Sequence, residues 1–457
     1  MSGARFPDGF RFGAATSAQQ IEGGAREGGR GESVWDRFAA QPGRVKDGST
    51  PAVACDHFHR WREDVALMRE LGLDAYRFST GWSRVLPTGE GAPNAAGLDY
   101  YDQLVDALLA AGITPFVTLN HWDLPQALDD KGGWGARACV DAFVAYAEAV
   151  SRRLGDRVKH WITHNEPWCI ATLGHEQGAH APGRKDPAEA LRVAHHLLLS
   201  HGRAVPVLRA HSPGAEVGFT TMMVKAEAAS DTPADRDAER QCDGLFNRWF
   251  LDPLYRGAYP ADVIADRVRH GALASPELPF VEPGDLATIA TPTDFVGVNY
   301  YSRAVVRAGA DGRPQGVPQA PPEALTEMGW EVYPRGLSDL LVRVTRDYAP
   351  ARLYVTENGA AFADPAPGAD GAIADPRRVE YLRTHLSAAL DAIAGGAPLA
   401  GYFCWSLLDN WEWAEGYTKP FGLHAVDFAT QRRTPKHSAR FYRDVVAARA
   451  VPAVVSP

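Results

Sequence analysis

Short runs rich in β-branched and aromatic residues recur along the whole chain, and longer segments with helical periodicity separate them. The runs predict eight strands, which we place at 10–16, 75–80, 115–120, 160–165, 217–222, 295–301, 353–357 and 402–407. Strict alternation of eight strands with helices implies a parallel sheet, and a sheet of eight such strands closes into a barrel. The predicted fold class is therefore α/β, a single (β/α)8 TIM barrel with long loops after its strands.

The segments between these runs carry the periodicity of outer helices. In 57–71 and 136–154, apolar residues at three- and four-residue spacing oppose Arg, Glu and Asp. No shift in composition marks a second domain, so we expect residues 1–457 to form one catalytic domain. The stretch 360–376 is dense in Ala, Asp, Pro and Gly, and it predicts a mobile surface loop after the seventh strand.

Composition and charge restrict the kind of partner. The chain is 45% hydrophobic and 23% charged, which is typical of a globular protein with a large core. Its formal net charge is -9 without any run of Lys or Arg, which argues against nucleic acid and anionic membranes as partners. This balance favours a small neutral substrate.

Cysteine usage and the N-terminus suggest a location. The sequence has no CxxC pair among its five cysteines, Cys55, Cys139, Cys169, Cys242 and Cys404. This spacing predicts free thiols in a reducing compartment rather than disulfides or a zinc site. The first residues contain no continuous apolar segment like that of a signal peptide, so we expect a cytoplasmic protein. We expect no metal and no cofactor.

Polar and aromatic residues follow the predicted strands, at the end of a barrel where active sites form. They are Gln20 after the first run, Arg77 in the second, His121 and Trp122 after the third, Asn165 and Glu166 at the fourth, Asn299 and Tyr301 at the sixth, Glu357 at the seventh, and Trp405, Glu412 and Trp413 at the eighth. A barrel with only a structural role would not need them there.

Two of these residues fit the cleavage of a glycosidic bond. That reaction requires a carboxylic acid that protonates the leaving oxygen and a carboxylate that attacks or stabilises the anomeric carbon. Glu166 and Glu357 end strands on opposite sides of the barrel mouth, so their side chains can face one ligand. We expect Arg77 and Tyr301 to hydrogen-bond Glu357 and keep it ionised. Glu166 has no cationic neighbour in sequence and would hold its proton more readily.

The other residues at the strand ends fit a sugar ligand. Flat aromatic faces pack against the C–H faces of a sugar, whereas amides, carboxylates and imidazoles hydrogen-bond its hydroxyl groups. Trp122, Trp405 and Trp413 suit the first role. Gln20, His121, Asn165 and Glu412 suit the second.

Taken together, these segments resemble glycoside hydrolase family 1, the family of many β-glucosidases, from about Phe6 to Tyr442. The motifs that carry the resemblance are FGAATSAQQIEGG at Phe12, YRFSTGWSRVLP at Tyr76, TLNHWDLPQAL at Thr118, THNEPW at Thr163, VGVNYYS at Val296, YVTENG at Tyr354 and WSLLDNWEWAEGY at Trp405. The resemblance implies a retaining β-glucosidase, with a small β-glycoside or an oligosaccharide as substrate.

The same resemblance implies roles for individual residues. Glu166 would be the acid/base and Glu357 the nucleophile, with carboxyl groups about 5 Å apart as in retaining enzymes. Trp330 would form a wall of the aglycone site, the part of the pocket that holds the leaving group. The resemblance assigns the site of the transferred sugar to Gln20, His121, Asn165, Tyr301, Trp405, Glu412 and Trp413. Asn165 would hold the 2-hydroxyl of that sugar.

The resemblance also implies a cis peptide between Trp405 and Ser406. The sequence departs from the family pattern at His164, Gln19 and Pro420. His164 alternates with Asn165 along a strand, so we expect its side chain outside the inner layer of the barrel.

Several alternatives remain. A 6-phospho-β-glycosidase would share the fold and both glutamates, although a carboxylate at Glu412 would repel a phosphate. A transglycosylase would use the same intermediate, and the sequence does not separate it from a hydrolase. A different class is an inactive sugar-binding protein on the same fold, but such proteins typically lose one carboxylate. The spacings His57-x-His59 and His160-x3-His164 only superficially resemble metal ligands. The first pair lies in a helical segment, where residues i and i+2 face apart, and the second lies on a strand without an Asp or Glu at a matching spacing.

Overall fold

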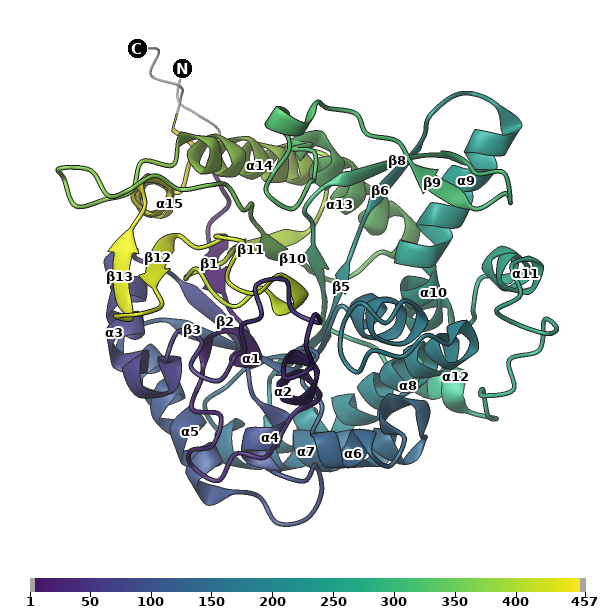
Figure 1. Cartoon of the computed structure of the whole chain (residues 1–457), viewed down its shortest axis with the longest axis horizontal. Coiled ribbons are helices and arrows are strands. Elements are labelled where there is room, and N and C mark those ends of the chain that lie inside the picture. The colour runs from purple at the N-terminus through teal and green to yellow at the C-terminus, as the bar shows by residue number, and fades with distance from the viewer. Residues whose placement is uncertain (1–4, 453–457) are drawn as a thin grey trace.

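The structure is a computed structural model that describes residues 5–452. Eight parallel strands form a closed barrel, ordered β1-β11-β10-β7-β5-β4-β3-β2 around the ring (Figure 1). They are β1 (Arg11–Ala15), β2 (Ala75–Ser79), β3 (Thr114–Asn120), β4 (His160–Asn165), β5 (Glu216–Met222), β7 (Phe295–Asn299), β10 (Leu353–Asn358) and β11 (Leu399–Trp405). The predicted TIM barrel is therefore confirmed, with each strand in its expected place.

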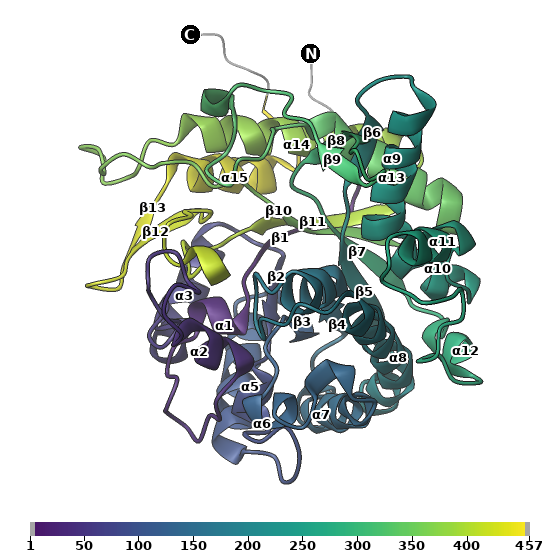
Figure 2. The ribbon, with the colours of Figure 1, turned by 45° about the vertical axis from the view of Figure 1, so that its right-hand side comes forward.

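Helices follow the strands and surround the barrel (Figures 1 and 2). The long ones are α3 (His57–Glu70), α5 (Ala95–Ala110), α7 (Ala138–Leu154), α8 (Pro187–His211), α13 (Pro334–Tyr348), α14 (Pro376–Ala394) and α15 (His437–Ala448). Shorter helices lie in the loops before them, namely α1 (Ala18–Ile21), α2 (Val34–Ala39), α4 (Trp82–Val85) and α6 (Gln126–Asp129). The apolar stripe of each long helix packs against the outer face of the strands.

Large side chains fill the inside of the barrel, and two glycines make room for them. Gly13 on β1 pairs in register with Phe403 on β11, and Gly218 on β5 pairs with Phe295 on β7. A Cβ atom at Gly13 would lie 2.4 Å from the Phe403 ring, and one at Gly218 would lie 2.2 Å from the Phe295 ring. Any residue other than glycine at position 13 or 218 would therefore place side-chain atoms in the space that these two rings occupy.

The connection from β5 to β7 is the most elaborate. It contains β6 (Lys225–Ala228), α9 (Pro233–Asp243), a π-helical segment η3 (Gly244–Arg248), α10 (Trp249–Arg256), α11 (Ala261–Arg269) and α12 (Asp285–Ile289). Strand β6 pairs with β8 (Arg303–Ala308), which pairs with β9 (Pro314–Gly316), so a small second sheet stands beside the barrel.

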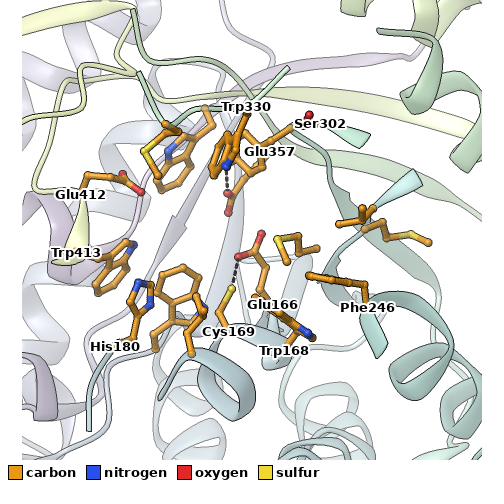
Figure 3. A pocket seen from close by; sticks show the side chains of 18 of the residues that line it. Glu166, Trp168, Cys169, His180, Phe246, Ser302, Trp330, Glu357, Glu412 and Trp413 are labelled. Carbon is orange, nitrogen blue, oxygen red and sulfur yellow. Dashed lines mark hydrogen bonds between the residues drawn. The ribbon is translucent and has the colours of Figure 1, made fainter. Parts of the chain in front are cut away.

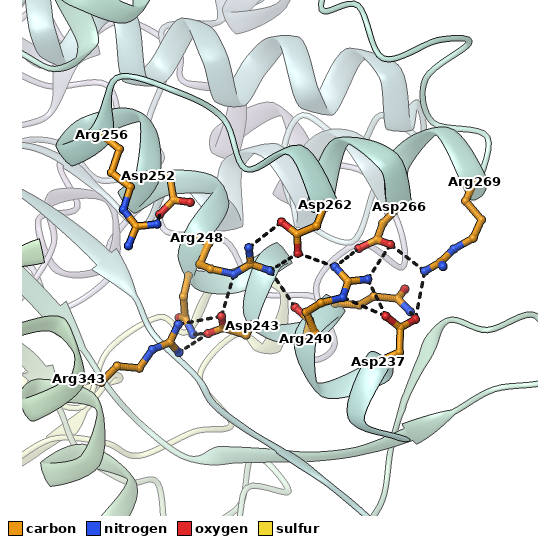
Figure 4. A network of polar contacts seen from close by, with 12 residues as sticks. Asp237, Arg240, Asp243, Arg248, Asp252, Arg256, Asp262, Asp266, Arg269 and Arg343 are labelled. Carbon is orange, nitrogen blue, oxygen red and sulfur yellow. Dashed lines mark hydrogen bonds and ion pairs between the residues drawn. The ribbon is translucent and has the colours of Figure 1, made fainter. Parts of the chain in front are cut away.

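A network of ion pairs holds this connection together (Figure 4). Arg240 on α9 contacts Asp262 at 2.6 Å and Asp266 at 2.8 Å, both on α11. Arg248 at the end of η3 contacts the same Asp262 at 2.7 Å and Asp243 at 3.0 Å. Arg343 on α13 also pairs with Asp243. The network thus fixes η3 from both of its ends.

The segment 360–376, which was predicted as a surface loop, is exposed at residues 365–371 but not along its whole length. It has no helix or strand before α14 begins, but its two ends are buried. Phe362 is enclosed, and Ile373 forms a bridge with Lys436. Asp364 lies 3.0 Å from Arg378 and 2.6 Å from Lys436. Ion pairs and apolar contacts, which the polar composition does not reveal, attach the loop to the barrel.

Two further expectations concern the chemistry of the chain and its environment. All five cysteines are free and buried, as predicted. Among residues 5–452, no helix combines the length and the apolar character that crossing a bilayer requires. After β11 the chain forms a hairpin of β12 (His424–Asp427) and β13 (Arg432–Pro435), and α15 follows.

Candidate active site

A cavity of about 410 Å³ opens at the carboxyl ends of the barrel strands. Its size suits a small ligand. Figure 3 shows Glu166 and Glu357 in the middle of its lining, with Glu412 and Trp413 on one side and Trp168 and Phe246 on the other. The predicted residues that line it are His121, Trp122, Glu166, Tyr301, Trp330, Glu357, Trp405, Glu412 and Trp413.

Glu357, on β10, is buried and has strong hydrogen-bond donors. Arg77 Nη1 on β2 donates to its Oε1 over 2.6 Å, and the hydroxyl of Tyr301 donates to its Oε2 over 2.5 Å. Burial is the largest influence and leaves the pKa of this carboxyl group above its ordinary value, although Arg77 and Tyr301 each lower it. The guanidinium cation and the phenol therefore favour the ionised form of Glu357.

Glu166 follows β4 and is also buried, but it has no cationic partner. Asn299 Nδ2 donates to its Oε1 over 2.8 Å. The Cys169 thiol contacts its Oε2 at 3.3 Å (Figure 3). Burial raises the pKa of Glu166 to about 8, and the negative charge of Glu357 contributes to this shift. The proton that the two carboxyl groups compete for is therefore held on Glu166.

Four predicted residues lie behind the cavity wall and do not line it. Each is fully or almost fully buried and hydrogen-bonds a residue that does. These pairs are Arg77 with Glu357, Asn299 with Glu166, Asn165 with His121 at 3.1 Å, and Gln20 with Glu412 at 3.1 Å. Arg77 and Asn299 also donate to the same Oδ1 atom of Asn165, over 2.6 and 2.9 Å. One connected network thus supports both glutamates.

Aromatic rings enclose the end of the cavity near Glu412. The centres of the Trp122 and Trp413 rings are 4.6 Å apart, and the His121 ring lies nearly parallel to those of Trp405 and Trp413. Trp122, Glu166 and Trp413 have positive φ angles of 72°, 46° and 53°. Such angles are uncommon for residues other than glycine, and they cluster where surrounding structure enforces a functional geometry.

Two expectations about backbone and side-chain geometry are confirmed. The peptide between Trp405 and Ser406 is cis. His164 points outward from the barrel, where its ring stacks on Phe143 of α7 and its Nε2 contacts the hydroxyl of Ser200 on α8 at 2.8 Å. The buried serine thus provides a partner for the imidazole.

Glu412 is a third buried carboxyl group in the cavity. Burial raises its pKa to about 8, and the charge of Glu357 contributes. At neutral pH this side chain is therefore protonated, which weakens the expectation that its negative charge repels a phosphate. The only Arg or Lys that lines the cavity in the described chain is Arg303, and it is paired with Glu227 at 2.7 Å and Glu331 at 2.8 Å. The cavity consequently offers no free cation to a phosphorylated sugar.

The sequence prediction missed a large part of the lining. The additional residues are Trp168, Cys169, Leu173, His180, Met222, Met223, Val224, Phe246, Ser302, Arg303, Ala304, Met328, Glu415 and Phe421. Trp168 and Cys169 directly follow the Asn-Glu-Pro motif, and Met222 ends a predicted strand, so position alone could have found these three. Phe246 lies far from any barrel strand and carries no such signal.

Acid–base cleavage of a glycosidic bond needs a carboxyl group that keeps its proton close to one that loses it, and this barrel mouth provides both. Fold and site therefore define a glycoside hydrolase. A scan against family models agrees, since Glycosyl hydrolase family 1 matches residues 2–451. The chain belongs to this family.

Relatives of known identity match the chain over nearly its full length. Beta-glucosidase A of Thermotoga maritima is 45% identical over 450 residues, covering 98% of each chain. Thermostable beta-glucosidase B of Thermobispora bispora is 49% identical over 449 residues, or 96% of this chain and 90% of the relative. A bifunctional beta-D-glucosidase/beta-D-fucosidase of Bifidobacterium breve is 43% identical and covers 97% of this chain and 98% of its own length.

Solved structures are similar over the same length. The family 1 β-glucosidase of Thermotoga maritima in complex with isofagomine lactam superposes with a TM-score of 0.93 at 44% identity, covering 98% of this chain and 100% of that one. The same enzyme in complex with deoxynojirimycin gives a TM-score of 0.93 at the same identity and coverage.

Proposed function

We propose that the chain is a retaining β-glucosidase in which Glu357 is the nucleophile and Glu166 the acid/base. The observation that carries these roles is the difference between the two environments. Glu357 contacts the Arg77 cation at 2.6 Å, whereas Glu166 receives hydrogen bonds only from the Asn299 amide and the Cys169 thiol. A nucleophile must be ionised before it attacks, and an acid must keep its proton until the leaving group departs.

In this mechanism the reaction has two displacements. The Glu357 carboxylate attacks the anomeric carbon while the Glu166 carboxyl group gives its proton to the glycosidic oxygen, so a covalent glycosyl-enzyme forms and the aglycone leaves. Glu166, now ionised, then removes a proton from water, which attacks the same carbon and releases the sugar with its original configuration. Loss of negative charge from Glu357 in the first step makes the proton loss of Glu166 easier, because the two charges no longer repel each other.

The end of the cavity near Glu412 is the proposed site of the sugar. Its Trp405 and Trp413 rings can pack on a sugar face, and His121 and Glu412 can bind sugar hydroxyl groups. Asn165 and Gln20 hydrogen-bond these two residues from behind the cavity wall and hold them in place. One relative carries the name of a glucosidase and a fucosidase, so the preferred sugar is a matter for measurement. Rates on aryl β-glucosides, β-fucosides and 6-phosphoglucosides would decide it, and turnover of the phosphorylated sugar alone would contradict the proposal.

Azide rescue of two variants tests the roles. Glu357→Ala should lower turnover on the order of 10³-fold or more, because the covalent path is lost. Azide that enters the freed space would attack an activated β-glucoside once and give the α-glucosyl azide. Glu166→Ala still forms the glycosyl-enzyme when the leaving group needs no proton. Azide would then attack that intermediate, and two inversions would give the β-glucosyl azide.

NMR of the products reads the anomeric configuration directly. A matched control is Glu90→Ala, which removes an exposed glutamate paired only with Lys131 and should yield no azide product. Exchanged anomers would mean that the nucleophile and the acid/base are assigned the wrong way round. Absence of any glucosyl azide from both variants, with hydrolysis intact, would refute the mechanism altogether.

A further inference from the structure

The half of the cavity that faces away from Glu412 is apolar. The catalytic pair lies between this half and the end near Glu412 and Trp413 (Figure 3). We propose that this half, the leaving-group half, selects apolar alkyl or aryl aglycones and disfavours a second sugar. The inference rests on the proposed function, because the leaving-group half is defined by the roles of Glu166 and Glu357.

Aromatic and thioether side chains form its surface. The rings of Trp168 and Phe246 stack at 4.4 Å between centres. Met222, the last residue of β5, and Met223 after it also line the cavity. Methionine is flexible and polarizable, and it adapts its shape to apolar groups of different outline. This composition favours a range of hydrophobic leaving groups.

The polar groups of this half already have partners within the protein. The Ser302 hydroxyl donates to the Glu331 carbonyl over 2.8 Å. The Arg303 guanidinium pairs with Glu227 and Glu331 and lies 3.9 Å from the centre of the Tyr333 ring.

These pairings make a second sugar an unfavourable occupant. Its hydroxyl groups would lose water on entry, and each one left without a partner costs free energy. His180, whose Nδ1 has no partner in the described chain, lies next to Trp413 and hence toward the other end (Figure 3). An alkyl or aryl group, by contrast, gains from contact with the same surface.

The apolar wall is also held in place before any ligand binds. Phe246 belongs to η3. Asp243, which precedes η3, and Arg248, its last residue, form an ion pair at 3.0 Å (Figure 4). Arg248 is further tied to Asp262 on α11. A preformed wall need not be ordered on binding, so the apolar contact contributes more of its energy to selection.

A series of alkyl β-glucosides tests the inference, since methyl, butyl and hexyl glucosides have leaving alcohols of nearly equal basicity. We expect kcat/KM to rise roughly two- to fourfold per methylene that the cavity buries. Cellobiose, whose leaving group is a second glucose, should fall below hexyl glucoside by about tenfold or more because of its unpaired hydroxyls.

Variants locate the effect. Phe246→Gln and Met222→Gln each place a polar amide in the wall, and both should lower the ratio of the hexyl to the methyl rate. Val224→Thr changes polarity with almost no change of shape and provides a milder variant, should the others fold poorly. The surface variant Glu90→Gln should leave the ratio unchanged.

The outcomes separate the two proposals. If cellobiose equals or exceeds hexyl glucoside, or if the rate does not depend on chain length, the inference about the aglycone is wrong while the β-glucosidase assignment stands. Unchanged hexyl-to-methyl ratios in all three wall variants would likewise overturn it. If the parent cleaves none of these glucosides, the proposed function itself fails.

Discussion

Glu357 and Glu166 have the same side chain, but the residues that contact them give them different proton affinities. Arg77 supplies a cation to Glu357, and Tyr301 adds a second donor, whereas Glu166 has neutral partners only. With the pKa of Glu166 at about 8, kcat/KM should decrease above that pH as the acid loses its proton. The identity of the neighbours therefore sets the working pH range.

Removal of the thiol beside Glu166 should move the alkaline side of the pH profile. The hydrogen bond from Cys169 stabilises the carboxylate and so lowers the pKa of Glu166. In Cys169→Ala that bond is lost, the pKa of Glu166 rises, and the decrease of kcat/KM should begin at higher pH. Cys169→Ser restores a donor and should shift it back. A pH–rate profile identical to the parent in both variants would show that the thiol has no influence on the acid.

The residues of the site differ in how far the sequence predicted them. Glu166, Glu357 and the tryptophans belong to motifs at strand ends, where the barrel itself brings them to one mouth. The sequence did not predict which of these residues line the cavity and which lie behind its wall. Asn165, for example, precedes the lining residue Glu166 directly and differs from it in side-chain direction. Distances between strands across the barrel decide which side chain reaches the cavity, and the sequence does not contain these distances.

At the scale of the elements, the inner layer of the barrel depends on a glycine paired with a phenylalanine. Gly218→Ala would put a methyl group 2.2 Å from the buried Phe295 ring, so the ring or the strand must shift. We expect a loss of stability of about 1–3 kcal/mol. Gly316→Ala on β9, where nothing lies within 4 Å, is the control and should stay within about 0.5 kcal/mol. Urea unfolding compares them, and equal midpoints would contradict this account.

The ion network between α9 and α11 gives a second prediction at this scale. Asp262→Ala removes the shared partner of Arg240 and Arg248, and we expect a loss of about 1–2 kcal/mol of stability, smaller at high salt. The exposed pair of Lys131 and Glu90 is the comparison, since Glu90→Ala should cost less than about 0.5 kcal/mol. Thermal unfolding at two salt concentrations measures both, and equal losses would show that the network adds nothing to single pairs.

The sequence predicted the regular elements better than the connections. All eight strands follow from local periodicity, because a buried strand must be apolar whatever surrounds it. The attachment of segment 360–376 to the barrel was missed, because Lys436 is distant in sequence and Arg378 lies within the pattern of the next helix. The position of Phe246 depends in the same way on long-range ion pairs. Contacts of this kind leave no local pattern.

On the scale of the whole molecule, the first and last strands of the barrel pair with each other. The register joins Gly13 to Phe403 and Ala15 to Trp405, and Tyr442 of α15 donates from its hydroxyl to the Gly13 carbonyl over 2.7 Å. Neither end of the barrel can detach without opening the ring. We therefore propose that the chain is a single domain that unfolds as one unit.

Calorimetry tests this proposal. Scans should show one cooperative transition, and a tight competitive inhibitor should move it as a whole to higher temperature. At an inhibitor concentration of 100 times its Kd, the gain in stability is about 2.7 kcal/mol. Two separated transitions, only one of which responds to the inhibitor, would show that the chain divides into independent units.

The pairing of β1 with β11 also affects how the chain folds during its synthesis. A ribosome releases β1 (Arg11–Ala15) long before its partner β11 (Leu399–Trp405). At ~5 to 20 residues per second, roughly 20 to 80 s pass between these two events. During this interval the edge of β1 that later pairs with β11 has no partner. An unpaired strand edge of this kind can pair with another nascent chain. Slower translation of the segment between β10 and β11 should therefore increase aggregation, and chaperones that shield the unfinished barrel should relieve it.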